Sequence, residues 1–183
     1  PAGEAGQGGW WYDSSTSVNL TAQLVTNCDF LNWDVDGTSQ GNGINPISVH
    51  MAVNHTAMAH YVMPYFLSVS SAFDSPSPSS GWFDSGSSIT ASVTTSVSGG
   101  AGTQYVCTGW TGTGSVPVSG SGSSVTFTIN APSSISWNWK TQYYLTVSSL
   151  YGSPAPVSGW FDSGSSVTAS VTTPVWGGGT QYV

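Results

Sequence analysis

The stretch GWFDSGSSITASVTT at Gly81–Thr95 decides the fold, because it returns as GWFDSGSSVTASVTT at Gly159–Thr173. Fourteen of the fifteen positions are identical, and the two copies lie 78 residues apart. Each copy reads as a strand, a turn and a strand, since an Asp can bond the backbone two residues on and the Gly that follows accepts a left-handed conformation. A weaker third copy supplies an earlier Asp at the same place. The predicted turn-forming residues are Asp13, Asp84, Gly86, Asp162 and Gly164.

The period extends over the whole chain. The segment at 65–71 aligns with 143–149 without a gap, and 47–62 aligns with 125–140, again 78 residues apart. A fixed period of this size indicates tandem modules, like beads on a string, rather than one enlarged core. The alignment predicts a first repeat at 1–64 that lacks its first strand, a complete second repeat at 65–142, and the first half of a third at 143–183.

The composition favours strands and excludes two classes of partner. Trp, Tyr and β-branched residues are spread along the chain, and the period-2 alternation of 125–129 and 135–139 is typical of half-buried strands. We therefore expect an all-β fold of small, mostly antiparallel modules with five or six strands each. Only one residue is basic and the net charge is −7, which argues against nucleic acids and anionic membrane surfaces as partners. No apolar run is long enough to span a bilayer.

Two segments of the complete repeat are expected to be loops. Pro76 and Pro78 bar a central strand between Phe73 and Ser80. The glycine-rich stretch from Gly109 to Gly122 is expected to loop out after a strand that ends near Trp110.

A family resemblance is carried by CDFLNWDVDGTSQGNGINPISVHMAVNHTAMAHYV at Cys28–Val62, by YYLTVSS at 143–149 and by the GWFDSGSSV turn. These motifs resemble the internalin B-repeat in its divergent bacterial and archaeal form. The resemblance implies a compact β-grasp-like module with a short helix across the sheet, strung in tandem along extracellular and cell-envelope proteins. It implies stalks, spacers or adhesive modules and supplies no catalytic residues.

Candidate chemical sites all have simpler structural interpretations. His50, His55 and His60 have no histidine counterparts in the second repeat, so neither a catalytic nor a zinc role is expected. Asp34 and Asp36 resemble the start of a calcium loop, but no bidentate acid follows, and a hairpin turn is the expected structure. We predict no enzyme activity, no cofactor and no metal. Cys28 and Cys107 occupy non-equivalent positions; half-buried free thiols are favoured over a bridge, which stays open as an alternative.

Surface chemistry points to an extracellular protein. With 5% charged residues, solubility must come from Ser, Thr or glycans, and Asn19 and Asn54 lie in glycosylation sequons, Asn19 on the outer face of a strand and Asn54 in a turn. Lys140, the one basic residue, is expected to be solvated at a strand end. A second interpretation is an adhesive or carbohydrate-binding stalk module of a larger protein that stacks sugars on exposed tryptophans. The candidates are Trp10, Trp11, Trp82, Trp160 and Trp176.

The register of the two ends predicts self-association. A repeat without its first strand leaves a groove, and the half repeat offers a strand of the missing kind. One molecule could complete the next by strand addition, giving a head-to-tail homopolymer, a filament or surface fibre. The alternative is that the 183 residues are part of a longer tandem array. The candidate intersubunit strand comprises Tyr143, Tyr144, Leu145, Thr146 and Val147.

Overall fold

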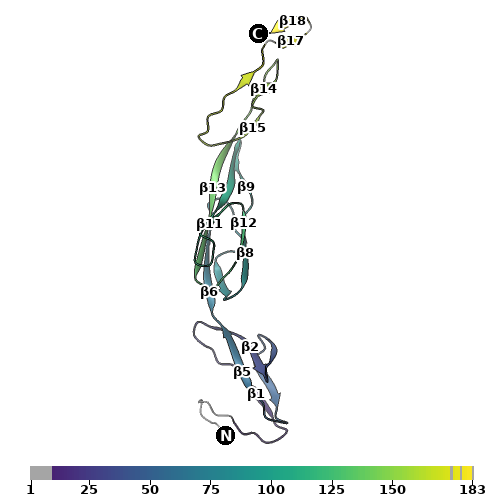
Figure 1. The fold of residues 1–183 in the computed structure, drawn as a ribbon, viewed down its shortest axis with the longest axis vertical. Coiled ribbons are helices and arrows are strands. Elements are labelled where there is room, and N and C mark those ends of the chain that lie inside the picture. Colours follow the sequence, from purple (N-terminus) through teal and green to yellow (C-terminus); the bar gives the residue numbers. More distant parts are fainter. Residues whose placement is uncertain (1–9, 174, 178, 183) are drawn as a thin grey trace. The chain divides into compact units, whose positions relative to one another are not determined.

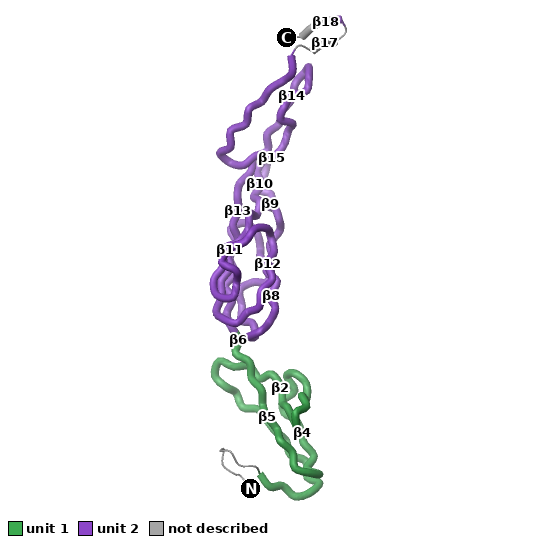
Figure 2. Tube along the Cα trace, viewed as in Figure 1, with its two compact units in different colours: residues 1–64 green, residues 65–183 purple. Residues whose placement is uncertain are grey.

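The protein is all-β. The computed structural model describes residues 10–173, 175–177 and 179–182, and these ranges contain strands, turns and bends but no helix (Figure 1). The chain forms two compact units, Pro1–Pro64 and Tyr65–Val183 (Figure 2). The short helix that internalin repeats carry is absent from the described ranges, and the sequence itself shows no helical period. The expectation of an all-β, mostly antiparallel fold is confirmed.

Unit 1 contains two small antiparallel sheets. β1 pairs with β4, and β2 lies between β3 and β5. The turn between β2 and β3 is the Asp36-Gly37 pair, whose φ angles of 51° and 79° fit a two-residue hairpin, so the expected hairpin is confirmed. The strands are β1 (Ser17–Leu20), β2 (Asp29–Val35), β3 (Thr38–Asn42), β4 (Ile47–His50) and β5 (Ala57–Val62).

Unit 2 is built around the long strand β13 (Ser133–Leu145). This strand pairs antiparallel with β10 (Thr103–Thr113) and β15 (Gly159–Asp162), and parallel with β6 (Pro64–Ser70). β8 (Ser88–Ser92) and β12 (Ser124–Thr128) form a separate antiparallel pair. The remaining strands are β7 (Gly81–Asp84), β9 (Ser96–Gly100), β11 (Ser119–Gly120), β14 (Pro154–Ala155), β16 (Ser170–Val171), β17 (Val175–Gly177) and β18 (Thr180–Tyr182).

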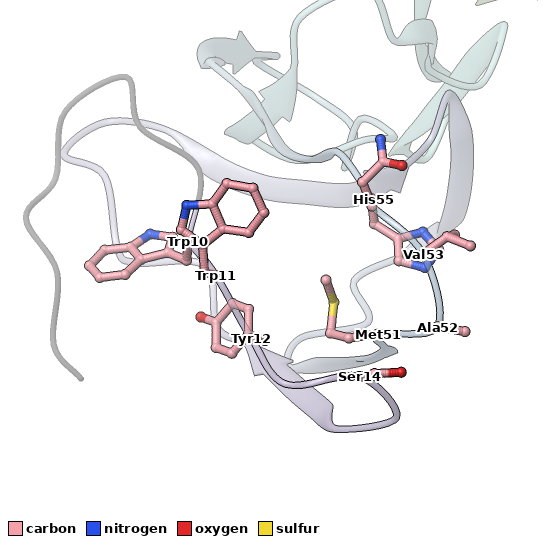
Figure 3. A pocket seen from close by; sticks show the side chains of 9 residues that line it. Trp10, Trp11, Tyr12, Ser14, Met51, Ala52, Val53 and His55 are labelled. Atoms are coloured by element: carbon pink, nitrogen blue, oxygen red, sulfur yellow. The ribbon is translucent and has the colours of Figure 1, made fainter.

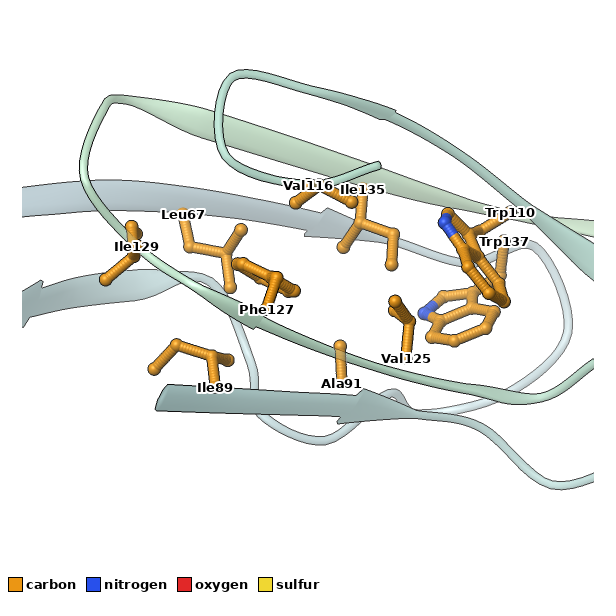
Figure 4. Close-up of a cluster of buried hydrophobic side chains, with 10 residues drawn as sticks. All are labelled: Leu67, Ile89, Ala91, Trp110, Val116, Val125, Phe127, Ile129, Ile135 and Trp137. Atoms are coloured by element: carbon orange, nitrogen blue, oxygen red, sulfur yellow. The ribbon is translucent and has the colours of Figure 1, made fainter. Parts of the chain in front are cut away.

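The core of unit 2 joins these strands. Alternate residues of β8 and β12 face inward and meet β6, β10 and β13 (Figure 4). Leu67 of β6, Ile129 and Ile135 are the largest fully buried side chains. The period-2 prediction for 125–129 is thus confirmed. The cluster comprises Leu67, Ile89, Ala91, Trp110, Val116, Val125, Phe127, Ile129, Ile135 and Trp137.

The glycine-rich stretch after Trp110 is a loop only in part, because turns and bends at 114–118 and 121–123 alternate with the end of β10 and with β11. β10 continues to Thr113, and its glycines allow close packing. A Cβ on Gly112 would lie 2.4 Å from a methyl carbon of Val116, and one on Gly120 would lie 2.2 Å from the Trp110 ring. These glycines are required by contact with neighbouring side chains, which composition alone does not distinguish from loop glycines.

The strand pairs of unit 1 have the same register as the corresponding strand pairs of unit 2. Val18 faces Val49 in the β1–β4 pair, as Ile89 faces Phe127 in the β8–β12 pair. Trp33 faces Ala59 as Trp110 faces Trp137, and a register shift follows Phe30 just as one follows Cys107. The two units differ in how deeply these residues are buried. Trp33 is the one buried residue among those described in unit 1.

Candidate functional site

Unit 1 contains a hollow where unit 2 has its core. Two cavities of about 530 and 430 Å³ share Trp10, Tyr12, Met51 and His55 in their linings. Figure 3 shows the three aromatic residues of 10–12 on one side and Met51 and His55 on the other, with open space between them. We refer to the two cavities together as the unit 1 hollow.

The floor of the unit 1 hollow comes from β1 and β4. Because side chains alternate across a strand, the register of this pair places Val18, Leu20 and Val49 on one face, and all three line the smaller cavity with Met51. Ser48 and His50 lie on the opposite face and are exposed.

The lining residues are the counterparts of core residues in unit 2. By the shared register, Val18 and Leu20 stand where Ile89 and Ala91 stand, and Val49 stands where Phe127 stands. The sequence alignment adds Met51 and Ala57 as the counterparts of Ile129 and Ile135. In unit 2 all five counterparts pack in one cluster with Leu67, which is 0% exposed. The unit 1 hollow is thus the place that Leu67 and its strand β6 occupy in unit 2.

The edge beside the hollow is also open. β5 is the outer strand of the β3-β2-β5 sheet, with β2 as its one partner among the described strands. Its counterpart in unit 2, the first half of β13, lies between β10 and β6. An outer strand presents unpaired backbone donors and acceptors on its free side, which another strand can complete.

A polar clasp fixes the start of this edge. Asp36 Oδ2 lies 2.6 Å from His55 Nδ1, and Asp36 Oδ1 accepts hydrogen bonds from the backbone N and the hydroxyl of Thr56 at 2.7 and 3.1 Å. The pKa of Asp36 is lowered, first by the Thr56 backbone N–H and then by His55. In unit 2 a Thr113–Ser134 hydroxyl contact of 2.7 Å stands at the same place. The sequence does not predict this contact, although the Asp-Gly turn and the His-Thr pair before β5 are visible in it.

The histidines and acids that the structure describes form no metal-binding cluster. His50 and His60 make no hydrogen bond or ion pair with the Asp36–His55 pair, and no cluster of three or more His, Cys, Asp or Glu among the described residues could hold a metal ion. Cys28 and Cys107 are free, half-buried thiols, as expected, and they belong to different units. The chemistry of the hollow is therefore that of an apolar surface beside an open strand edge.

The candidate intersubunit strand is partly exposed. Tyr143, Tyr144 and Leu145 end β13 and pair with β15, and Leu145 is 37% exposed. The backbone N and O of Val147 bond to Ser158 Oγ at 2.8 and 3.1 Å. Val69 bonds to Ser80 Oγ at 2.8 and 3.2 Å in the same manner. Thr146 is exposed and lies outside the strands.

The three predicted turns have the same backbone hydrogen bond, but the residue at the glycine position differs in the first. Ser87 N donates to Asp84 O and Ser165 N donates to Asp162 O, both at 3.0 Å; Gly86 and Gly164 have φ angles of 85° and 80°. In the earlier copy Thr16 N donates to Asp13 O, and Ser15 takes the glycine position with φ 66°.

Lys140 is not the solvated lysine at a strand end that the sequence suggests. It lies within β13, and its Nζ is 2.8 Å from Asp162 Oδ1, which also accepts a 2.7 Å hydrogen bond from Gln142. The pKa of Asp162 is lowered, first by Lys140 and then by Gln142. These contacts tie β13 to β15 across the predicted boundary at 142/143.

The remaining candidate residues lie at the surface. Asn19, in β1, and Asn54, between β4 and β5, are both exposed, and Asn54 lines the larger cavity. Trp11 is 96% exposed, Trp82 68% and Trp160 40%. Trp82 packs edge-on against Phe66, with 5.3 Å between the ring centroids, and Trp160 packs in the same way against Tyr144, with 5.2 Å between the ring centroids. The side chain of Trp176 lies outside the described residues.

Comparison of the chain with protein-family models, with curated proteins and with solved structures gave no match. A search of the described residues for a helix long and apolar enough to cross a membrane also found none.

Proposed function

We propose that the protein is a non-catalytic structural subunit of an extracellular filament or surface fibre, built from tandem β-repeats. Two observations support the repeats. Contacts recur at the sequence period of 78 residues. The hydrogen bond between Val69 and Ser80 recurs between Val147 and Ser158. The ring contact of Phe66 with Trp82 recurs as that of Tyr144 with Trp160. The strand registers of unit 1 and unit 2 follow the same alignment. On this proposal the repeats are 1–64, 65–142 and 143–183.

The observation that carries the assembly proposal is the unit 1 hollow. It is lined by the counterparts of the residues that pack with Leu67, and it adjoins the open edge of β5. A strand from a second copy would bury its side chains in the hollow and its backbone groups against β5. Because the donating and accepting surfaces differ, each copy can accept at one surface and donate at another, which gives a head-to-tail chain.

Electron microscopy and light scattering of the concentrated full chain test this function. Wild type is expected to form linear assemblies whose mean mass rises with concentration. Val49→Lys places a charge in the hollow and is expected to keep the protein monomeric, while Ser48→Lys places the same charge on the opposite face of β4 and is expected to assemble as wild type does. An unchanged β-sheet circular dichroism spectrum controls for folding of both variants. A wild type that stays monomeric at every concentration would refute the proposal.

An adhesive, carbohydrate-binding stalk is the second candidate function. The exposed Trp82 and Trp160, each held edge-on by an aromatic neighbour, form two similar platforms at the period of the chain. Rigid aromatic faces stack against apolar ligand surfaces at low entropic cost. Binding on a glycan array that disappears in Trp82→Ala and Trp160→Ala would favour this candidate over the filament.

The extracellular location predicts glycans on Asn19 and Asn54, since both are exposed and both lie in sequons. Treatment of the native protein with a glycosidase tests it. The glycosidase is expected to lower the mass of the wild type. The loss of mass should be smaller in Asn19→Gln and in Asn54→Gln, because each variant lacks one glycan. A wild-type mass that the enzyme leaves unchanged would contradict the prediction.

A further inference from the structure

Building on the proposed filament, we infer that the strand entering the unit 1 hollow is Leu145–Ser148 of a second copy. It runs parallel to His55–Met58, and Leu145 takes the position that Leu67 has in unit 2. The inference names the partner segment, its direction and its register. It rests on the comparison of the two units and on the shape of the donor segment.

Unit 2 supplies the template for direction and register. There β6 runs parallel to β13, and the paired residues run from Leu67 with Ser133 to Ser70 with Ser136. The sequence alignment places His55–Met58 at the positions of 133–136, and Leu145–Ser148 at the positions of 67–70. Transfer of the register therefore pairs Leu145 with His55, and Val147 with Ala57.

On one side, the donor segment already has backbone contacts like those that β6 makes on its β7 side. In unit 2, β6 is held on one side by β7 and by the Ser80 contact to Val69, and on the other side by β13. The donor segment is held on one side by β15 and by the Ser158 contact to Val147. Its other side has no strand partner in the described pairings beyond residue 145. A strand held in shape in this way loses little conformational entropy on docking.

The side chains fit in size and charge. Leu20 is larger than its counterpart Ala91, while Val49 is smaller than Phe127, so the hollow keeps an apolar floor of mixed sizes. Segment 143–149 carries no charged residue, and the charge of Asp36 at the rim is engaged by His55 and Thr56. Docking therefore buries Leu145 without leaving a charge unpaired.

Trp10 and Tyr12 lie over the hollow outside any strand. Their alignment partners, at 81 and 83, lie in β7, which is the neighbour of β6. A second copy brings its own β15 at this place, so entry of the donor requires 10–12 to move aside.

A peptide with the sequence of 143–149, YYLTVSS, tests the inference on the full chain at a concentration where it is monomeric. The expected result is saturable binding with slowed hydrogen exchange at 55–58. The same peptide with Leu145→Asp should bind at least tenfold more weakly, because the burial of one leucine side chain is lost and a charge enters the hollow.

Three results would overturn the inference: no slowing at 55–58, equal binding of the two peptides, or exchange at 55–58 that is already slow in the monomer because another part of the same chain fills the hollow. The outcome is separable from that of the proposed function. Full chains that assemble while the peptide does not protect 55–58 would leave the filament standing and remove this register. Chains that stay monomeric while the peptide binds would remove the filament and leave the groove and its register.

Discussion

Substitution of Leu67 by Ala measures how much unit 2 depends on the strand whose position is open in unit 1. Leu67 is 0% exposed and packs in the cluster with Ile129 and Ile135, which are also fully buried. Leucine-to-alanine changes at such sites cost about 2–5 kcal/mol, and the well-packed surroundings place this one at about 3 kcal/mol or more. The free energy of unfolding of unit 2 should fall by that amount.

Urea unfolding of dilute protein, followed by tryptophan fluorescence, is the assay. Leu145→Ala is the matched control, since it removes the same atoms from the corresponding position, which is 37% exposed, and it should cost about 1 kcal/mol. The transition of unit 1 should not move in either variant. Two results would refute the view that the unit 1 hollow corresponds to the place of Leu67 in unit 2. One is an equal loss of unfolding free energy in the two variants, and the other is a loss below about 1 kcal/mol for Leu67→Ala.

Three further predictions follow from particular contacts. Gly86→Ala should lower the free energy of unfolding of unit 2 by about 1–2 kcal/mol, as measured in a thermal melt. The cause is the left-handed φ alone, because a Cβ at Gly86 meets no neighbour within 4 Å. Gly81→Ala is the control and should be neutral, because Gly81 has an ordinary φ. The lowered pKa of Asp36 stabilises unit 1 above pH 4, and this contribution should disappear as the pH falls through the folded-state pKa; Asp36→Asn should flatten the acid side of the stability–pH curve, and an unchanged curve would contradict it. Lys140→Met should raise the pKa of Asp162 toward its usual value, as measured by NMR titration of the carboxyl carbon. The pKa of Asp74, which hydrogen bonds from Thr94 lower, serves as the unaffected control.

The strands and hairpin turns were largely predictable from the sequence, because they depend on local patterns. The alternation in β12 predicts its buried face, and the Asp36-Gly37 pair predicts the turn between β2 and β3. The continuation of β10 through Gly112 was not predictable in this way. A glycine that admits Val116 and one that loosens a loop look alike until the packing partner is known.

The candidate site was predictable in part. The period of the sequence predicts a place for an added strand in the first repeat, and it names the segment 143–147 as a donor. The clasp between Asp36 and His55 joins residues 19 positions apart and has no counterpart of the same residue types in the second repeat, so no period could reveal it. The position of Trp10 and Tyr12 over the hollow also depends on tertiary packing.

Disulfide trapping between two copies tests the central claim most directly, namely that one copy's strand lies beside β5 of another. Val69 pairs with Ile135 in unit 2, which places Val147 of one copy opposite Ala57 of the next. Paired strand positions lie within the Cα distance that a disulfide requires. Two proteins are mixed after Cys28 and Cys107 are replaced by Ser: one carries Ala57→Cys and the other carries Val147→Cys. The account predicts a covalent heterodimer in excess over either homodimer, and its loss when Ala57→Cys is replaced by Ser48→Cys on β4. Equal amounts of all cross-linked pairs, or no cross-linking in assembled material, would contradict it.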